Sequence, residues 1–296
     1  MSDETYEAQG RSWTQVTPAE DEAEVLRRHE ANREAWNEGA QHYTAESEER
    51  IARLRAGESS LHPVERSMLG DLGSWCETAI HLQCASGEDT LSLWLEGAKR
   101  VIGIDISETH IANARLTAEA LEAPADWYRC DILATPHELD GTADLVFTGR
   151  GAIDWIHDIE AWARVCARLL KPGGVLCLFD NHPVVYWFDP DADSWRLLQV
   201  DYFDYAETSQ GWGATYIGAT LDTPPDQHMR KYERAWIPSG VFTALVASGL
   251  TVERFGEHPD QYYEGFPNIP SPDRERIPHT FSMRARKPAR PGKSQA

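Results

Sequence analysis

Basic residues are scarce in this sequence. Its 296 residues include 28 Lys and Arg against 48 Asp and Glu, a formal net charge of −20. This balance argues against nucleic acid or an anionic membrane surface as a partner, because both are polyanions. No apolar run approaches the roughly 20 residues that span a bilayer, and residues 1–10 lack the basic-then-apolar order of a signal peptide.

Cysteine motifs are also absent. The five cysteines form an odd set with no Cys-x-x-Cys pair, namely Cys76, Cys84, Cys130, Cys166 and Cys177. In a chain without an export signal, this pattern predicts free buried thiols rather than disulfides or a zinc site. We therefore expect a cytoplasmic protein without a metal site.

The first part of the sequence is polar. Residues 1–17 show no clear period and are interpreted as a mobile tail. A helix is predicted from Pro18 to about Asn37, with Thr17 as its N-cap and acidic residues in its first turn. Two shorter helices are predicted over residues 46–55 and 63–72. This region is interpreted as a helical lid rather than a core.

From residue 78 the pattern becomes that of an α/β domain. Short apolar segments alternate with amphipathic stretches of helical length, which is typical of parallel βαβ units. The expected strands are residues 79–82, 101–104, 127–128, 143–147 and 175–179. The expected helices are residues 88–96, 107–121 and 159–170, with a break at the Lys-Pro-Gly-Gly segment 171–174.

Beyond residue 180 the sequence is rich in aromatic residues. Strand-like pieces occur at residues 202–205 and 232–236, followed by a predicted helix over 239–248. A final antiparallel strand pair is predicted over 251–255 and 279–287. The fold prediction is a Rossmann-like, doubly wound, mostly parallel sheet with a C-terminal antiparallel strand pair, an N-terminal helical lid and an aromatic cap insertion.

Domain boundaries follow from these changes in pattern. The predicted divisions are an acidic tail and first helix (1–35), a main domain (36–288) and a disordered basic tail (289–296). The main domain is divided into the lid (36–77), a cofactor-binding core (78–183) and a substrate cap (184–237 and 259–278).

The residues just after each predicted strand are the candidate ligand contacts, because ligands of open parallel sheets bind at the carboxyl ends of the strands. Segment 83–90 is a turn of small residues leading into a helix, where backbone N–H groups can approach a ligand. Asp105 is placed to accept hydrogen bonds from ribose hydroxyls, and Asp131 from an adenine amino group. The alternatives are an unliganded tight turn, a helix cap and an ordinary loop aspartate. Ser107 is the better N-cap candidate.

The order of these motifs resembles class I S-adenosylmethionine-dependent methyltransferases, and most of all their bacterial small-molecule branch. The motifs are His-Leu-Gln-Cys…Gly-Glu-Asp-Thr-Leu, Gly-Ile-Asp-Ile-Ser, Cys-Asp-Ile, Asp-Leu-Val-Phe, Leu-Leu-Lys-Pro-Gly-Gly and His-Pro. The resemblance implies S-adenosylmethionine as cofactor and methylation of a small molecule, as in secondary metabolism. The implied cofactor contacts are Tyr43, Gln83, Cys84, Ala85, Ser86, Gly87, Asp89, Thr90, Asp105, Ile106, Asp131, Ile132, Thr148 and Gly149.

The first loop departs from the family pattern. His81, Gln83 and Ala85 stand where an acid and two glycines are usual, and only Gly87 remains. One alternative is therefore a protein that binds S-adenosylmethionine without transferring its methyl group, in a regulatory role or by using the sulfonium electrostatically. A less favoured one is an NAD(P)-dependent oxidoreductase, because the Gly-x-Gly-x-x-Gly motif expected for it is missing.

On the acceptor side, His182 is the candidate base or orienting group, because imidazole titrates near neutral pH. Its alternative role is to form a hydrogen bond with the backbone of the turn at Pro183. The candidate substrate contacts are Arg150, Asp154, Trp155, His157, Tyr186 and Trp236, with helix capping or solvation as the alternative for those after the fourth strand. The aromatic cap favours a planar or hydrophobic acceptor. The methylated atom stays open, and a homodimer is an expected assembly.

Overall fold

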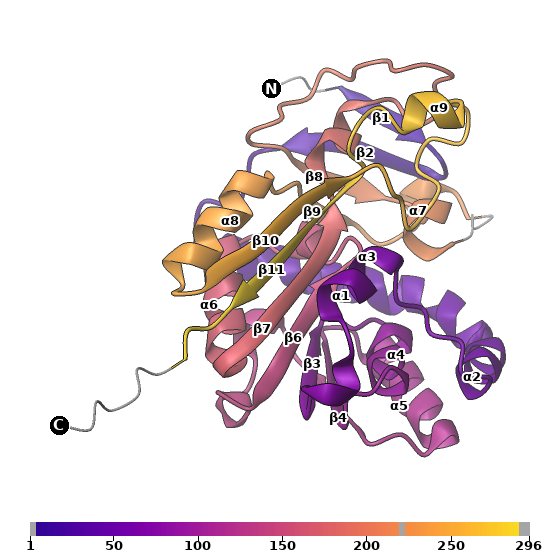
Figure 1. Ribbon diagram of the computed structural model, residues 1–296. Coiled ribbons are helices and arrows are strands. Elements are labelled where there is room, and N and C mark those ends of the chain that lie inside the picture. The colour runs from indigo at the N-terminus through magenta and orange to yellow at the C-terminus, as the bar shows by residue number, and fades with distance from the viewer. Residues whose placement is uncertain (1–3, 219–222, 290–296) are drawn as a thin grey trace.

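Two β-sheets organise the computed structural model of this protein, which describes residues 4–218 and 223–289. One sheet has seven strands in the order β10-β11-β7-β6-β3-β4-β5, and the other has four in the order β1-β2-β8-β9. Figure 1 shows the four-stranded sheet above the seven-stranded sheet.

The seven-stranded sheet is mostly parallel. Strands β3 to β7 run parallel to their neighbours, whereas β11 pairs antiparallel with both β7 and β10. The strands are β3 (Thr78–Leu82), β4 (Arg100–Asp105), β5 (Ala125–Arg129), β6 (Ala143–Gly149), β7 (Leu170–Asn181), β10 (Thr251–His258) and β11 (Thr280–Arg286). The predicted Rossmann-like sheet with a C-terminal antiparallel strand pair is confirmed. The helix Ile159–Leu169 ends just before residues 171–174, as predicted, but the strand begins earlier than expected, because β7 starts at Leu170.

Helices cover both faces of this sheet. Helices α4 (Glu88–Leu95) and α5 (Glu108–Leu121) lie on one face, and α6 (Ile159–Leu169) and α8 (Pro238–Ala247) lie on the other (Figure 1). Alternate side chains of β3 serve the two faces, as the period of a strand requires. Ile80 and Leu82 pack in a cluster with Trp162 of α6, whereas His81 contacts Thr90 of α4.

The local caps explain where these helices begin. Ser107 caps α5, because its hydroxyl accepts a hydrogen bond from the backbone N–H of His110 at 3.2 Å. This confirms the predicted cap and leaves the Asp105 carboxylate, two residues earlier, outside the helix. Asp158 caps α6 in the same way through Ala161 N at 2.8 Å.

The predicted mobile tail is wrong for its described part. Strands β1 (Thr5–Ala8) and β2 (Arg11–Val16) form a hairpin, and β2 pairs with β8 (Ala206–Gln210), which in turn pairs with β9 (Lys231–Arg234). Trp13 is buried and stacks on Tyr6 with ring centroids 5.6 Å apart. The hairpin is polar and its partner strands are distant in sequence, so its own pattern did not reveal it.

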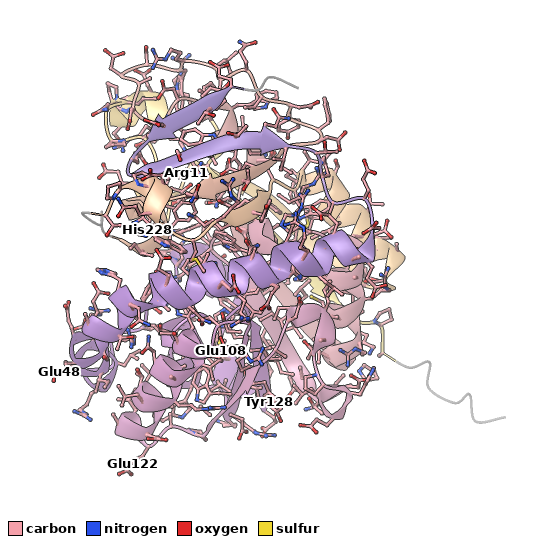
Figure 2. The ribbon with its side chains drawn as sticks, turned by 180° about the vertical axis from the view of Figure 1, so that it is seen from behind. Arg11, Glu48, Glu108, Glu122, Tyr128 and His228 are labelled. Atoms are coloured by element: carbon pink, nitrogen blue, oxygen red, sulfur yellow. The ribbon has the colours of Figure 1, made fainter. Side chains whose placement is uncertain are left out.

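The N-terminal helices are α1 (Glu22–Ala45), α2 (Ser47–Arg55) and α3 (Pro63–Leu69), followed by a 3₁₀ turn, Leu72–Ser74. The predicted start of α1 at Pro18 is wrong, because Asp21 is the N-cap and accepts a hydrogen bond from Glu24 N at 2.8 Å. In Figure 2, α1 crosses the molecule between the two sheets, with Arg11 and His228 on one side and Glu108 on the other.

The cap region differs from the prediction in detail. The expected strand at residues 202–205 is wrong, because β8 begins at Ala206. Two short helices, α7 (Ala214–Ile217) and α9 (Ser271–Arg274), complete the region. Residues 290–296 of the predicted basic tail lie outside the described residues. Within the described ranges, no helix is both long and apolar enough to cross a membrane.

Candidate functional site

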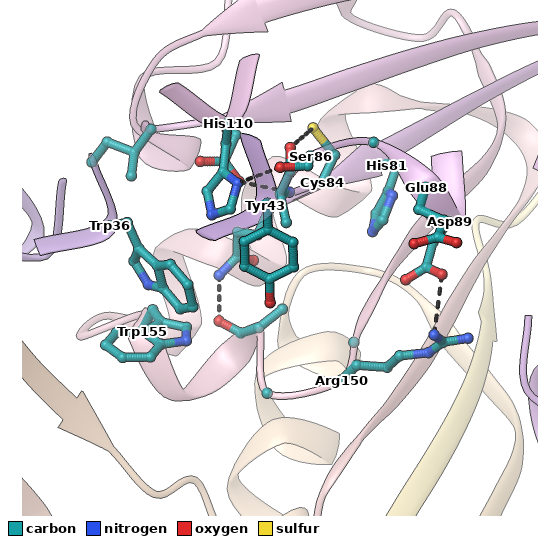
Figure 3. A pocket seen from close by; sticks show the side chains of 18 of the residues that line it. Trp36, Tyr43, His81, Cys84, Ser86, Glu88, Asp89, His110, Arg150 and Trp155 are labelled. Atoms are coloured by element: carbon teal, nitrogen blue, oxygen red, sulfur yellow. Dashed lines mark hydrogen bonds and ion pairs between the residues drawn. The ribbon is translucent and has the colours of Figure 1, made fainter. Parts of the chain in front are cut away.

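A cavity of about 400 Å³ lies at the carboxyl ends of β3, β4 and β6. Its floor comes from the loops after these strands, and α1 contributes Trp36 and Tyr43 to its wall. Figure 3 shows the Tyr43 ring directed into this space, with Trp36 and Trp155 side by side at one end. Most predicted cofactor contacts line it: Tyr43, Gln83, Cys84, Ala85, Ser86, Gly87, Asp89, Asp105, Ile106, Asp131, Ile132 and Gly149.

The loop after β3 keeps a glycine-like backbone although it has lost glycines. Gln83 has φ 57°, Ala85 has φ 46° and Gly87 has φ 82°. Non-glycine residues rarely adopt this left-handed conformation, and such strain persists where the surroundings hold it, often at binding sites. The Gln83 amide donates to the carbonyl of Ala152, which fixes the loop against the segment after β6. The loop of residues 83–87, which we call the cradle, therefore keeps its left-handed backbone although its sequence departs from the family pattern.

Asp105 stands at the end of β4 and anchors this loop. Its carboxylate accepts hydrogen bonds from Ala85 N at 2.9 Å and Ser107 N at 2.8 Å. Burial raises its pKa to about 6, although these backbone N–H groups oppose the shift. A buried carboxylate that lines the cavity is well suited to accept further hydrogen bonds from hydroxyl groups.

Asp131 is held by the N-terminal helix. Its carboxylate contacts His29 Nδ1 at 2.7 Å and accepts from Leu133 N at 2.8 Å. The backbone N–H of His157 donates to His29 Nε2 at 3.1 Å, so the proton of a neutral His29 ring sits on Nδ1. Burial alone would raise the pKa of Asp131, but its hydrogen bond from His29 lowers it. Sequence reasoning missed His29, which lines the cavity from α1.

Arg150 follows β6 and is bound on three sides. Its guanidinium contacts Glu65 at 2.6 Å, Asp89 at 3.1 Å and the carbonyl of Ser60 at 2.6 Å. Figure 3 draws the pair with Asp89. Burial raises the pKa of Glu65 even though Arg150 lowers it. Arg150 lines the cavity as predicted, but its charge is already shared between two acids.

Arg50 of α2 is a further cavity residue that sequence reasoning missed. It is 2% exposed, and it donates to Thr117 Oγ1 at 3.3 Å and to the carbonyl of Tyr43 at 3.0 Å. Its third nitrogen, Nη2, is buried and has no hydrogen-bond partner in the part of the chain that the structure describes. An unpaired buried donor on an arginine is costly, so this nitrogen is available to an anionic group of a ligand.

A second cavity, of about 130 Å³, adjoins the first and shares Trp36, Arg150, Trp155 and Tyr216 with it. The predicted substrate residues Asp154 and Tyr186 line it, as do Glu233 of β9 and the hairpin residues Arg11 and Trp13. The cap segments before and after α8 also contribute to its wall: Val185, Phe188, Pro190, Leu198, Tyr205, Tyr262, Tyr263, Gly265 and Phe266.

His182 lies outside the linings of both cavities. Its Nδ1 accepts from Val184 N at 3.2 Å, which caps the 3₁₀ turn Pro183–Trp187, and its Nε2 contacts Glu257 at 3.1 Å. Burial lowers the pKa of His182 although Glu257 raises it. This placement matches the alternative role in the turn rather than that of a base facing the cofactor.

Four other predicted residues also lie behind the cavity walls. His157 contacts the carbonyl of Tyr232 at 3.3 Å, and Trp236 donates to the carbonyl of Ile156 at 2.8 Å. Thr90 contacts His81 Nδ1 at 2.8 Å, and Thr148 donates to Gln83 Oε1 at 3.5 Å. These side chains support the residues that line the site. Within residues 4–218 and 223–289, no group of three or more His, Cys, Asp or Glu could hold a metal ion.

Comparison with known proteins gives a match at the larger cavity. Residues 79–174 match the family described as "Methyltransferase domain". This stretch runs from β3 into β7 and includes the strand ends around the cavity. This part of the chain is therefore similar to methyltransferase domains, and the fold expected from the resemblance to class I S-adenosylmethionine-dependent methyltransferases is confirmed.

Two curated relatives match parts of the chain. The chain is 38% identical over 79 residues to a ubiquinone biosynthesis O-methyltransferase of Rhodopseudomonas palustris (strain HaA2), covering 26% of this chain and 29% of the relative. It is 34% identical over 130 residues to an uncharacterised 37.1 kDa protein in a transposon of Streptomyces fradiae, covering 43% and 33%. The chain thus spans a third or less of these curated relatives.

Among solved structures, an S-adenosylmethionine-dependent methyltransferase from Mesorhizobium loti is similar in fold. It superimposes with a TM-score of 0.54 at 20% identity, covering 76% of this chain and 96% of that one.

Proposed function

We propose that this protein transfers the methyl group of S-adenosylmethionine to a small-molecule acceptor. The observation that carries the proposal is the larger cavity, which lies at the strand ends of the methyltransferase domain and retains a left-handed backbone loop. When bound there, the cofactor supplies a methyl group on a positively charged sulfur. The protein's contribution is to align the acceptor with that methyl group and to exclude water.

The residues present fit this cofactor. Asp105 would accept the ribose hydroxyls, and the backbone of residues 83–87 would approach the methionine part. The free Nη2 of Arg50 would bind the methionine carboxylate through a charge-assisted hydrogen bond. Ile106 and Ile132 would frame the adenine, and Asp131, already bound to His29, would order that end of the cavity.

The acceptor would occupy the smaller cavity. In this proposal the two cap segments, residues 184–237 and 259–278, act with the β1–β2 hairpin to cover it. Its aromatic lining supports an acceptor with an aromatic or hydrophobic part, as in secondary metabolism. Trp155 and Arg150, which line both cavities, would contact cofactor and acceptor together.

The remaining parts of the proposal concern partners and location. The net charge of −20 supports a protein that does not bind nucleic acid. Exposed Phe242 and Val246 of α8 and Phe255 of the edge strand β10 support a homodimer through this side. The five cysteines are free, which supports a reducing, cytoplasmic location.

Binding of the cofactor is tested with Arg50→Met. By calorimetry, we expect the affinity for S-adenosylhomocysteine to fall about tenfold or more, because a charge-assisted hydrogen bond is lost. Affinity for 5′-methylthioadenosine, which lacks the amino acid part, stays unchanged. The control is Arg55→Met on the same helix, whose side chain is exposed and donates to the carbonyl of Ala120. An equal loss for both ligands would contradict the role of Arg50.

Transfer itself is tested by incubating the protein with S-adenosylmethionine and cell extract. Acceptor-dependent formation of S-adenosylhomocysteine, with a mass gain of one methyl group on a small molecule, is the expected result. Binding of S-adenosylhomocysteine without any such product would instead favour a protein that uses the cofactor without transferring its methyl group.

A further inference from the structure

The smaller cavity contains two buried carboxylates on separate elements. Asp154 lies in the 3₁₀ turn Ile153–Trp155 after β6, and Glu233 lies in β9 of the four-stranded sheet. Each is 3% exposed, and both line the cavity. The two groups also interact electrostatically, because the negative charge of Glu233 contributes to the raised pKa of Asp154. These two acids therefore share one small space.

Each carboxylate accepts its hydrogen bonds on one of its two oxygens. Asp154 accepts from Asn181 Nδ2 at 2.9 Å and from the Tyr186 hydroxyl at 2.6 Å, and both bonds end on Oδ2. Glu233 accepts from the Tyr216 hydroxyl at 2.7 Å and from Ser209 at 3.4 Å, and both end on Oε1. Among the described residues, Oδ1 of Asp154 and Oε2 of Glu233 have no hydrogen bond, although a carboxylate accepts about four.

The cations nearby are already engaged. Arg11 pairs with Glu207 and lies 3.6 Å from the same Oε1 of Glu233. The Lys231 ammonium donates to the carbonyl of Gly211 and lies 4.4 Å from the Trp212 ring centroid. Arg150 is bound by Glu65 and Asp89, as described above. The carboxylate of Asp180, which raises the pKa of Asp154, adds a further negative charge and accepts hydrogen bonds from the backbone N–H groups of Gly151, Ile153 and Asn181.

This arrangement leaves more buried acid than buried cation around the cavity, and burying unpaired charge is expensive. These surroundings favour the protonated form of each acid in the free protein. Burial together with Asp180 raises the pKa of Asp154, and burial together with Glu207 raises the pKa of Glu233 to about 7. A ligand cation would replace those protons and complete the pairing.

The rest of the lining suits a cation with an organic body. Aromatic rings from five parts of the chain surround the space, and the faces of such rings attract ammonium groups. These rings are Trp13, Trp36, Trp155, Tyr186, Phe188, Tyr205, Tyr216, Tyr262, Tyr263 and Phe266.

We propose that the smaller cavity recognises an acceptor that carries a protonated amine, held by Asp154 Oδ1 and Glu233 Oε2 within the aromatic wall. This inference rests on the proposed function for the identity of the ligand as methyl acceptor. The recognition itself is a property of the cavity and is testable without methyl transfer.

The experiment compares amines with neutral partners of matched shape. Calorimetry at pH 7.5 on protein saturated with S-adenosylhomocysteine uses tyramine against 4-propylphenol and benzylamine against benzyl alcohol. We expect at least one amine to bind about tenfold or more tightly than its neutral partner, because a desolvated charge pair is formed. Repeating the titration in phosphate and in Tris, which differ in ionisation enthalpy, should reveal proton release on amine binding.

Variants assign the effect to the two acids. Glu233→Gln and Asp154→Asn should each remove most of the preference for the amine, while binding of the neutral partner changes less than about threefold. The matched control is Asp144→Asn, a carboxylate at the opposite end of β6 that pairs with Lys171. It should keep the wild-type preference. Thermal melting and S-adenosylhomocysteine binding establish that each variant is folded.

The outcomes are distinct. If each amine binds no more tightly than its neutral partner in the wild type, the proposal is overturned, whatever the variants do. A preference that survives both substitutions would equally refute this site. Failure to bind S-adenosylhomocysteine would instead count against the proposed function, and the amine comparison would then be made on the protein alone.

Discussion

Two substitutions in the loop after β3 should have opposite effects on stability, although both positions have a left-handed backbone. Gly87→Ala adds a methyl group at φ 82°, and Ala85→Gly removes one at φ 46°. Because the two residues lie in the same loop, the comparison separates the requirement for glycine from a general sensitivity of the loop.

For Gly87→Ala, the added Cβ would lie 2.6 Å from Cη2 of Trp127 and 2.8 Å from Cβ of Ala114. Ala114 belongs to α5 and cannot retreat without moving the helix. Overpacking of this kind costs roughly 1–3 kcal/mol, and the left-handed backbone costs an alanine roughly 1–2 kcal/mol. After the smaller entropy of the unfolded alanine chain is allowed for, we expect destabilisation by about 2–4 kcal/mol.

For Ala85→Gly, the native strain of roughly 1–2 kcal/mol is relieved, whereas glycine adds roughly 0.5–1 kcal/mol of unfolded-chain entropy. The net expectation is stabilisation by about 0.5–1 kcal/mol. The hydrogen bond to the Asp105 carboxylate uses only the backbone N–H of residue 85, so it survives the substitution.

Urea unfolding of both variants, followed by tryptophan fluorescence, measures these free energies. Calorimetry with S-adenosylhomocysteine then reports on the cradle, which should be retained in Ala85→Gly. Destabilisation by Ala85→Gly as large as that by Gly87→Ala would refute the view that the loop is a strained but intact glycine cradle.

Three further outcomes are expected. Burial lowers the pKa of His81 to about 4. Between pH 4 and 6.5, His81 is therefore protonated in the unfolded chain but neutral in the folded one, so the free energy of unfolding decreases as the pH falls through this range. His81→Gln should reduce the slope of unfolding free energy against pH at pH 5.5 by up to about 1.4 kcal/mol per pH unit. Arg11→Met leaves the buried Glu207 without its ion-pair partner and should cost about 3–5 kcal/mol in urea unfolding, with S-adenosylhomocysteine affinity retained; a neutral effect would contradict a stabilising role of this ion pair. Burial raises the pKa of every cysteine thiol, with Cys130 at about 11; thiol titration of the native protein at pH 8 should therefore proceed far more slowly than in denaturant, and rapid reaction of several thiols would contradict the buried placements.

The core of the fold was predictable because its signals are local. Strands β3, β4 and β6 contain short apolar runs that are followed by a helical pattern, and Ser107 and Gly87 mark the starts of two of these helices. The carboxyl ends of parallel strands meet at one edge, so Asp105 and the loop before α4 could be placed in one cavity from sequence order alone.

The acceptor side was not predictable in the same way. Glu207, Lys231 and Glu233 are charged residues in short strands, and nothing local indicates that they are buried. Arg50 and His29 lie on polar helices where arginine and histidine are ordinary surface residues. Only the tertiary packing of α1 and α2 against the strand ends brings them into the cavity.

The pairing of β2 with β8 has a consequence for the order of assembly. Ser12 pairs with Gln210, roughly 200 residues later in the chain, and contacts of such long range close slowly during folding. The strands of the cofactor cavity are all complete by residue 149, whereas the smaller cavity needs β9, which ends at residue 234. A growing chain would thus possess the cofactor end of the site well before the wall that selects its second ligand.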